Sequence, residues 1–171
     1  MEAFWQEVGI GAPDFAQWMR VALRLGAAIA LAGVVGFDRE RRQQPAGLRT
    51  HMLVALGAAL FTIVPLEVQG GSTDLARLVQ GLAPGIGFLG AGAILKREEH
   101  RNVHGLTTAA SIWLAAAIGF AAGSGQIGIA AMGTVFTYAI LVALRRLERN
   151  LPTLPSGKSS PEQHTKPDTA E

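Results

Sequence analysis

The sequence contains no cysteine, which excludes disulfide bonds, cysteine-ligated metal sites and thiol catalysis. Charged residues make up only 16% of its 171 residues, whereas globular proteins average about 25%. Acidic residues are missing altogether from five long apolar runs in the middle of the chain. Each run is 17 to 20 residues long, and a helix of roughly 20 residues crosses about 30 Å of hydrocarbon. These absences exclude an ordinary soluble domain and predict a polytopic membrane protein.

The five runs predict five transmembrane helices and an all-α fold class. They lack the polar stripe that an amphipathic helix of a soluble protein shows. Only the first run holds charged side chains, Arg20 and Arg24. We expect Arg20 to extend toward the interface, while the deeper Arg24 is a candidate for pairing within the bundle. The runs are Trp18–Phe37, Thr50–Leu66, Leu78–Leu95, Leu106–Gly123 and Gln126–Leu144.

Basic residues are concentrated in alternate connectors, as they are on the cytoplasmic side of membrane proteins. The connector 38–49 has four arginines, the connector 96–104 has three basic residues, and three more follow the fifth run. The other two connectors share one basic residue, Arg77. This pattern predicts an outside N-terminus and a cytoplasmic C-terminus. The first 17 residues hold three acidic and no basic residues, unlike a secretory signal, so we expect the first run to be retained.

The domain organisation follows from a change in composition near residue 148. Residues 1–148 are predicted to form one transmembrane domain. Residues 149–171 contain four prolines among polar and charged residues, a composition that cannot bury a core. We therefore expect a disordered cytoplasmic tail at 149–171.

A glycine-rich segment occupies the third run. Its Gly85-x-Gly87-x-x-Gly90 string mimics a dinucleotide-binding fingerprint, but that motif requires a preceding strand and a βαβ unit, so we reject it here. Glycines at this depth instead let helices approach closely, and Pro84 kinks or breaks a helix. The segment is either a tightly packed kinked helix or a broken helix that lines a small polar site. The helix-packing candidates are Gly81, Pro84, Gly85, Gly87, Gly90 and Gly92.

A charged cluster flanks the first connector. The segment Asp38–Arg42 is expected to prolong the first helix past the membrane until Pro45 interrupts it, and Arg49–His51 returns to the same level. One interpretation is a solvated helix end that contacts anionic lipid. The other is an interlocked network of carboxylates, arginines and a histidine, which holds helices in register or binds an ion or anion.

A hydroxyl-rich face is predicted in the fourth run. His104, Thr108, Ser111 and Ala115 share one helix face by their spacing. Hydroxyls that face a bundle bond to neighbouring helices, for roughly 0.6–2 kcal/mol each. Ser111 is not an obvious nucleophile, because no base is placed beside it by local spacing, and the four histidines show no metal-ligand spacing within a run.

Four blocks of this chain resemble the signature blocks of the MgtC/SapB family. They are Gly36–Glu40, Pro45–His51, Gly85–Gly92 and Gly105–Trp113, within a likeness that covers about residues 22–144. The resemblance implies a multi-pass protein of the bacterial inner (plasma) membrane, linked to adaptation to low magnesium. It is expected to regulate another membrane complex rather than to perform chemistry. The alternative is a transporter or channel for Mg²⁺ or another small ion.

The resemblance also implies which residues matter. Its carried-over positions, together with Ser111 from the hydroxyl face, give ten candidates: Asp38, Arg39, Glu40, Arg49, Thr50, His51, Asn102, Thr107, Thr108 and Ser111. The expected partners are the lipid bilayer, another membrane protein complex or a second copy in a homodimer. We expect no nucleic acid, cofactor, bound metal or enzymatic activity.

Two departures from the family pattern are visible. His104 stands where the family commonly has arginine, which weakens a phosphate or lipid contact carried over to that position. Longer members add a soluble regulatory domain after the last span, whereas this sequence continues only as the proline-rich tail, so it resembles a short form.

Overall fold

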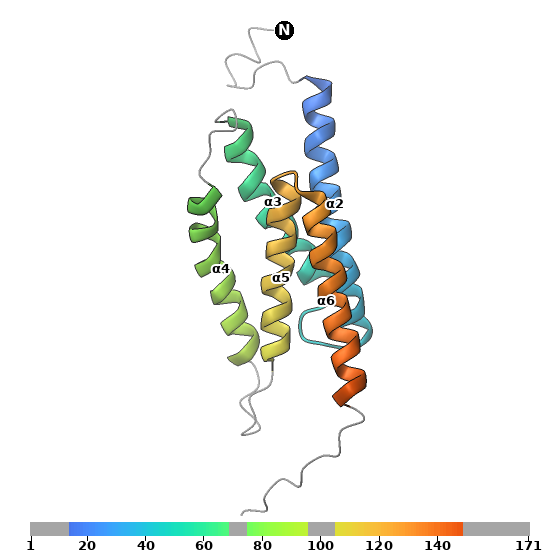
Figure 1. Ribbon diagram of the computed structural model, residues 1–171. Helices are drawn as coiled ribbons and strands as arrows, with labels where there is room; N and C mark the ends of the chain where they lie inside the picture. Colours follow the sequence, from blue (N-terminus) through green and yellow to red (C-terminus); the bar gives the residue numbers. More distant parts are fainter. Residues whose placement is uncertain (1–13, 69–74, 96–104, 149–171) are drawn as a thin grey trace, which may run out of the picture.

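A computed structural model of the chain contains five α-helices in the residues that it describes, which are 14–68, 75–95 and 105–148 (Figure 1). No strand occurs in these ranges, and the predicted all-α class is confirmed. The expected tail at 149–171 lies outside them, as do Asn102 and His104. The helices are α2 Phe15–Arg41, α3 Leu48–Val68, α4 Leu75–Leu95, α5 Leu106–Gly123 and α6 Ile127–Glu148.

Each of these helices covers one of the predicted apolar runs, except that α6 begins one residue after the start of the fifth run. Within the described ranges, three segments are long and apolar enough to cross a membrane: Phe15–Arg41, Leu48–Glu67 and Leu106–Gly123. A shorter apolar segment, Ile127–Ala143, lies in α6. The expectation of five membrane crossings therefore remains a prediction.

The ends of the helices follow the local sequence. Asp14 caps α2, and its side chain accepts a hydrogen bond from the backbone N–H of Ala16. The helix extends to Arg41, and Pro45 lies in the turn that follows it, as predicted from the sequence. Pro84 lies inside α4, which continues through it as one helix; α4 is therefore not the broken helix of the alternative interpretation.

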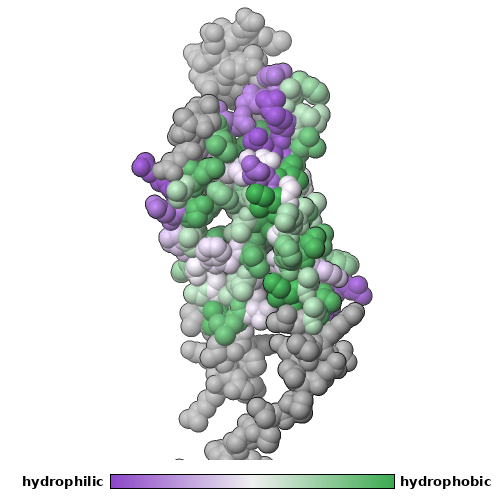
Figure 2. Space-filling view, viewed as in Figure 1, coloured by the Kyte–Doolittle hydropathy of each residue, from purple (hydrophilic) through white to green (hydrophobic). Residues whose placement is uncertain are grey.

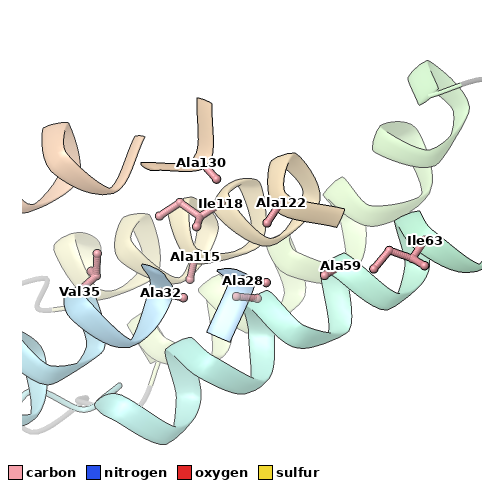
Figure 3. Close-up of a cluster of buried hydrophobic side chains, with 10 residues drawn as sticks. Ala28, Ala32, Val35, Ala59, Ile63, Ala115, Ile118, Ala122 and Ala130 are labelled. Atoms are coloured by element: carbon pink, nitrogen blue, oxygen red, sulfur yellow. The ribbon is translucent and has the colours of Figure 1, made fainter. Parts of the chain in front are cut away.

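The helix α5 lies at the centre of the bundle and contacts all four other helices. In Figure 1, α4 and α6 stand on opposite sides of α5. The buried core has small side chains, which allow the helices to approach closely. Figure 3 shows this cluster, whose members are Ala28, Ala32, Val35, Ala55, Ala59, Ile63, Ala115, Ile118, Ala122 and Ala130.

The closest helix crossing lies between α3 and α5. A Cβ atom added to Gly119 would collide with the carbonyl oxygen of Ala55, and one added to Gly123 would lie 2.8 Å from the carbonyl oxygen of Ala59. Two small pairs with four-residue spacing therefore face each other, Gly119 and Gly123 on α5 against Ala55 and Ala59 on α3. The glycine-rich segment of α4 plays no part in this crossing.

Most of the glycines of α4 face no other residue in the part of the chain that the structure describes. Nothing lies within 4 Å of a Cβ atom added to Gly81, Gly85, Gly87 or Gly92, whereas one added to Gly90 would lie 3.5 Å from Ala109. The expectation that this face packs against another helix thus remains a prediction, and it requires a partner other than the helices described here.

The outer surface is apolar over most of its length. Figure 2 shows hydrophobic residues over the middle of the visible face, with the hydrophilic residues mostly toward the ends of the bundle. Large apolar side chains are exposed on several helices, among them Leu53, Phe61, Phe88 and Val135. Such a surface suits hydrocarbon rather than water, because monomeric soluble proteins rarely expose large contiguous apolar patches.

Candidate functional site

A buried polar network lies at the end of the bundle where α2 finishes and α5 begins; we call this the Arg39 end. Only 5% of the surface of Arg39 is exposed. Its Nη2 donates hydrogen bonds to Thr108 Oγ1 at 3.1 Å and to Gln44 Oε1 at 3.2 Å. One guanidinium thus joins the last turn of α2, the following connector and the first turn of α5.

His51 forms the second part of this network and is completely buried. Its Nδ1 lies 2.8 Å from the carbonyl oxygen of Gly47, and its Nε2 lies 3.1 Å from Ser111 Oγ. Because a carbonyl oxygen only accepts, Nδ1 carries the hydrogen, and Nε2 of a neutral ring is an acceptor.

The hydroxyl of Ser111 has two possible acceptors. Its Oγ lies 2.8 Å from the carbonyl oxygen of Thr108 as well as 3.1 Å from His51 Nε2. A hydroxyl has one hydrogen to donate, so it serves one of the two acceptors at a time. The network therefore links α3 to α5 through His51 and Ser111, and α5 to α2 through Thr108 and Arg39.

Glu40 has a separate role at the start of α3. Its carboxylate accepts a hydrogen bond of 2.9 Å from the backbone N–H of Leu48, the first residue of α3. A negative charge at this position is favourable for the helix macrodipole. A Cβ atom added to Gly47 would collide with this carboxylate, so the connector needs glycine beside it.

The other charged residues at the end of α2 interact with side chains one turn away. Arg42 Nε donates to Asp38 Oδ2 at 2.6 Å, one helical turn away. This hydrogen bond raises the pKa of Arg42, and its guanidinium stays charged. Arg41 lies over the ring of Phe37, 5.7 Å from its centroid, at the distance of a cation–π contact.

The network lies beside a close crossing of α2 and α3. A Cβ atom added to Gly36 would lie 2.9 Å from Leu48 Cα and 3.0 Å from His51 Cβ. Because residue 36 lacks a side chain, the first turn of α3 packs directly on α2. The crossing covers the His51 ring and holds it against Ser111 of α5.

The structure brings together four of the predicted site residues, Arg39, His51, Thr108 and Ser111. Asp38 and Glu40 adjoin them with separate partners, whereas Arg49 and Thr107 are exposed and Thr50 is half-buried. Asn102 lies outside the described residues. Sequence reasoning missed Gln44 as a partner of Arg39, since an amide in a charged connector resembles an ordinary solvated residue.

A second polar cluster connects helices at the opposite end of the bundle. Arg24 Nη1 lies 3.6 Å from Glu67 Oε1, and Gln17 Nε2 donates to Glu67 Oε2 at 2.8 Å. The Arg24 guanidinium also covers Gly125, where an added Cβ atom would lie 3.2 Å from Nη2. Arg24 thus pairs within the bundle and links α2 to the end of α3 and to the turn before α6.

An apolar crevice of about 110 Å³ separates α4 from α5. Its walls are Val79, Leu82, Ala83, Ile86, Trp113, Ala116, Ala117 and Phe120. These side chains offer no oxygen ligands, which Mg²⁺ requires. Within the described ranges, no group of three or more histidine or acidic side chains is placed to hold a metal ion.

Comparison with known proteins identifies the family. The MgtC family profile matches residues 25–150, most of the chain. The chain belongs to the MgtC family. It is a membrane protein with magnesium-related relatives, and the resemblance predicted from the four sequence blocks is confirmed.

Three relatives illustrate the match. The chain is 44% identical over 143 residues to Protein SrpB of Synechococcus elongatus, covering 77% of this chain and 79% of SrpB. It is 47% identical over 123 residues to Protein MgtC of Brucella abortus, covering 72% of this chain and 50% of MgtC. It is 40% identical over 132 residues to the Escherichia coli protein named "Putative magnesium transporter YhiD", covering 73% of this chain and 60% of YhiD.

The match covers only part of the longer relatives, because the chain spans about half the length of the Brucella protein. No solved structure is similar to this fold at a significant level.

Proposed function

We propose that this family member regulates another membrane complex during adaptation to low magnesium, by binding that complex rather than by chemistry. It would lie in the bacterial inner membrane with five spans. The N-terminus would be outside and the C-terminus cytoplasmic. Four arginines at the Arg39 end support this orientation, because basic residues favour the cytoplasmic side; they are Arg39, Arg41, Arg42 and Arg49.

The outward face of α4 is the observation that carries this proposal. Gly81, Gly85, Phe88 and Gly92 share one face by their helical spacing. An added Cβ atom on any of the three glycines would contact nothing within 4 Å, and Phe88 is 80% exposed. Small residues on membrane helices typically face other helices rather than lipid, so this face suits a transmembrane helix of a partner.

The position of α4 connects this surface to the buried network. Among the described helices, α4 contacts α5 and, less extensively, α3. Helix α5 carries Thr108 and Ser111 on the side that meets α2 and α3. A partner helix docked on α4 would therefore act on the rest of the bundle mainly through α5.

Transport of Mg²⁺ is the second candidate function, and the name of the relative YhiD, a putative magnesium transporter, favours it. The distribution of charged side chains favours regulation over transport. The charged side chain buried in the described core is Arg39, which is a cation and would repel Mg²⁺. Intramembrane acids normally mark cation paths, and the five apolar runs contain none.

Catalysis by Ser111 and His51 is not part of the proposal. The two side chains are hydrogen-bonded to each other, but both are enclosed, with 2% and 0% exposure. A substrate would have to separate α3 from α5 to reach the hydroxyl. We assign the pair the structural role of joining these helices.

The proposal is tested by affinity purification from detergent extracts of cells grown in low magnesium. A stoichiometric membrane partner is expected with the native chain, and Gly85→Leu is expected to lose most of it. Gly26→Leu is the matched control, because Gly26 on α2 also faces open space. Absence of any partner, or equal recovery by both variants, contradicts the proposal.

The same preparations distinguish the remaining options. Recovery of only a second copy of the chain, detected by its mass in detergent, supports a homodimer instead of a heterologous complex. Magnesium-dependent flux into liposomes that contain the purified chain alone supports the transport alternative.

A further inference from the structure

No carboxylate of the described residues lies within ion-pairing distance of Arg39, although the neighbouring Asp38 favours its charge at longer range. The two carboxylates nearest to it along the chain are engaged elsewhere, Asp38 with Arg42 and Glu40 with the backbone of Leu48. In the part of the chain that is described, no carboxylate forms an ion pair with Arg39. Its hydrogen-bond acceptors are the neutral oxygens of Gln44 and Thr108.

One donor of this guanidinium has no hydrogen-bond partner among the described residues. The Nε atom of Arg39 is enclosed and makes no hydrogen bond. Arginine cannot lose its charge by deprotonation in a protein, and a buried charge without a counter-ion is strongly unfavourable. An anion bound at this guanidinium would supply the missing counter-charge.

We propose that Arg39 is a binding site for a phosphate group, whose oxygen takes the place of the Gln44 amide oxygen. The planar guanidinium fork matches the geometry of phosphate and binds it more strongly than a neutral amide. Gln44 lies in the connector rather than in a helix and is half-buried. Its release would also break the 3.3 Å hydrogen bond from Gln44 Nε2 to the carbonyl oxygen of Arg42, but it would leave the bonds among Thr108, Ser111 and His51 in place.

The position along α2 supports phosphate as the ligand. The helix has 27 residues, and at 1.5 Å per residue it measures about 40 Å, which exceeds the hydrocarbon thickness of about 30 Å. Phe37 is the last apolar residue before the charged turn. Arg39 follows two residues later, at the depth where the phosphates of lipid headgroups begin.

The phosphate can come from a phospholipid headgroup or from free inorganic phosphate, since both present the same oxygens. The site goes beyond the proposed regulatory function and does not depend on it. Binding is measured on the purified chain, so failure of the partner experiment leaves this inference standing, and the reverse also holds.

Thermal unfolding of the full chain in a maltoside detergent, which contains no phosphate, provides the test. Tryptophan fluorescence is followed with a phospholipid, with inorganic phosphate, or with sodium chloride at matched ionic strength. A ligand at about 100 times its Kd is expected to raise the Tm by about 5 °C or more. A response to the lipid alone identifies a headgroup, and a response to inorganic phosphate identifies the free anion.

Two variants at the site and one control locate the effect. Gln44→Glu supplies an internal carboxylate, so it is expected to raise the Tm without additive and to shrink the ligand shift to about 1 °C or less. Arg39→Gln is expected to lose the shift. Arg41→Gln removes an exposed arginine two residues away and is expected to keep it.

No Tm shift in the native chain with either phosphate source rules out the site. An equal shift in the native chain and Gln44→Glu does the same. If Arg39→Gln does not fold, Gln44→Glu still decides the question, because it keeps the arginine and replaces only the neutral acceptor.

Discussion

The α3–α5 crossing offers the sharpest prediction about what holds the bundle together. We expect Gly119→Ala to destabilise the protein, although alanine is the better helix former by about 1 kcal/mol. The new Cβ atom would collide with the carbonyl oxygen of Ala55 and lie 2.7 Å from its Cα and carbonyl carbon atoms. These are backbone atoms in the middle of a helix and cannot rotate away.

The magnitude follows from how far the helices must separate. Ordinary van der Waals contact begins at about 3.5 Å, so α3 and α5 must move apart by roughly 1 Å. A gap of that size loses a quarter to a half of the dispersion energy along the contact. Overpacking of this kind lowers the free energy of unfolding by about 1–3 kcal/mol, and we expect the upper part of that range.

The assay is reversible unfolding in mixed micelles by titration with a denaturing detergent, followed by tryptophan fluorescence, to which Trp113 on α5 contributes together with Trp5 and Trp18. Gly57→Ala is the matched control, because residue 57 lies on α3 and a Cβ atom there contacts nothing within 4 Å. The control should be unchanged or slightly more stable. If Gly119→Ala is as stable as Gly57→Ala, close packing at this crossing does not stabilise the bundle.

Three further changes test the polar contacts in the same assay. Gly47→Ala should displace the Glu40 carboxylate from the start of α3 and lower the free energy of unfolding by about 1–2 kcal/mol; unchanged stability would show that this capping contact is unimportant. Ser111→Ala leaves His51 Nε2 without its hydrogen-bond partner and should lower it by about 1–3 kcal/mol, whereas the exposed control Thr107→Ala should stay within about 0.5 kcal/mol. Glu67→Gln removes the ion pair with Arg24 and should lower the free energy of unfolding by at most about 1 kcal/mol. This difference should shrink in 1 M salt, and a loss that does not depend on salt would argue against an ionic origin.

The helices were predictable because the apolar runs determine them directly. The extension of α2 to Arg41 and its end before Pro45 also followed from local rules. Which glycines form the tight crossing could not be predicted. Gly81 and Gly85 have the same four-residue spacing as Gly119 and Gly123, and only the rotation of each helix about its axis decides which pair faces a neighbour.

The same limit applies to the polar site. Sequence spacing placed Thr108 and Ser111 on one face of α5, and both are buried. It placed no base beside Ser111, because His51 is 60 residues away and reaches it from another helix. Among the arginines of the α2 end, Arg39 turns inward while Arg41 is exposed, a difference of two residues, or about 200° around the helix.

The polar network and the tight crossing belong to one continuous seam. Along α3, His51 lies one turn before Ala55 and two turns before Ala59; along α5, Ser111 lies two turns before Gly119. Both small-residue pairs therefore continue the faces that carry the hydrogen bonds. A change in α3–α5 spacing must alter the His51–Ser111 contact, and loss of that contact must loosen the end of the seam.

Helix α5 connects the proposed anion site at Arg39 to the proposed docking surface on α4. The side of α5 that contacts α3 also binds Arg39 through Thr108. The next residue, Ala109, faces Gly90 of α4. An anion at Arg39 and a helix docked on α4 would therefore act on adjacent residues of one helix turn. Because linkage is reciprocal, any effect of phosphate on partner affinity requires an equal effect of the partner on phosphate affinity.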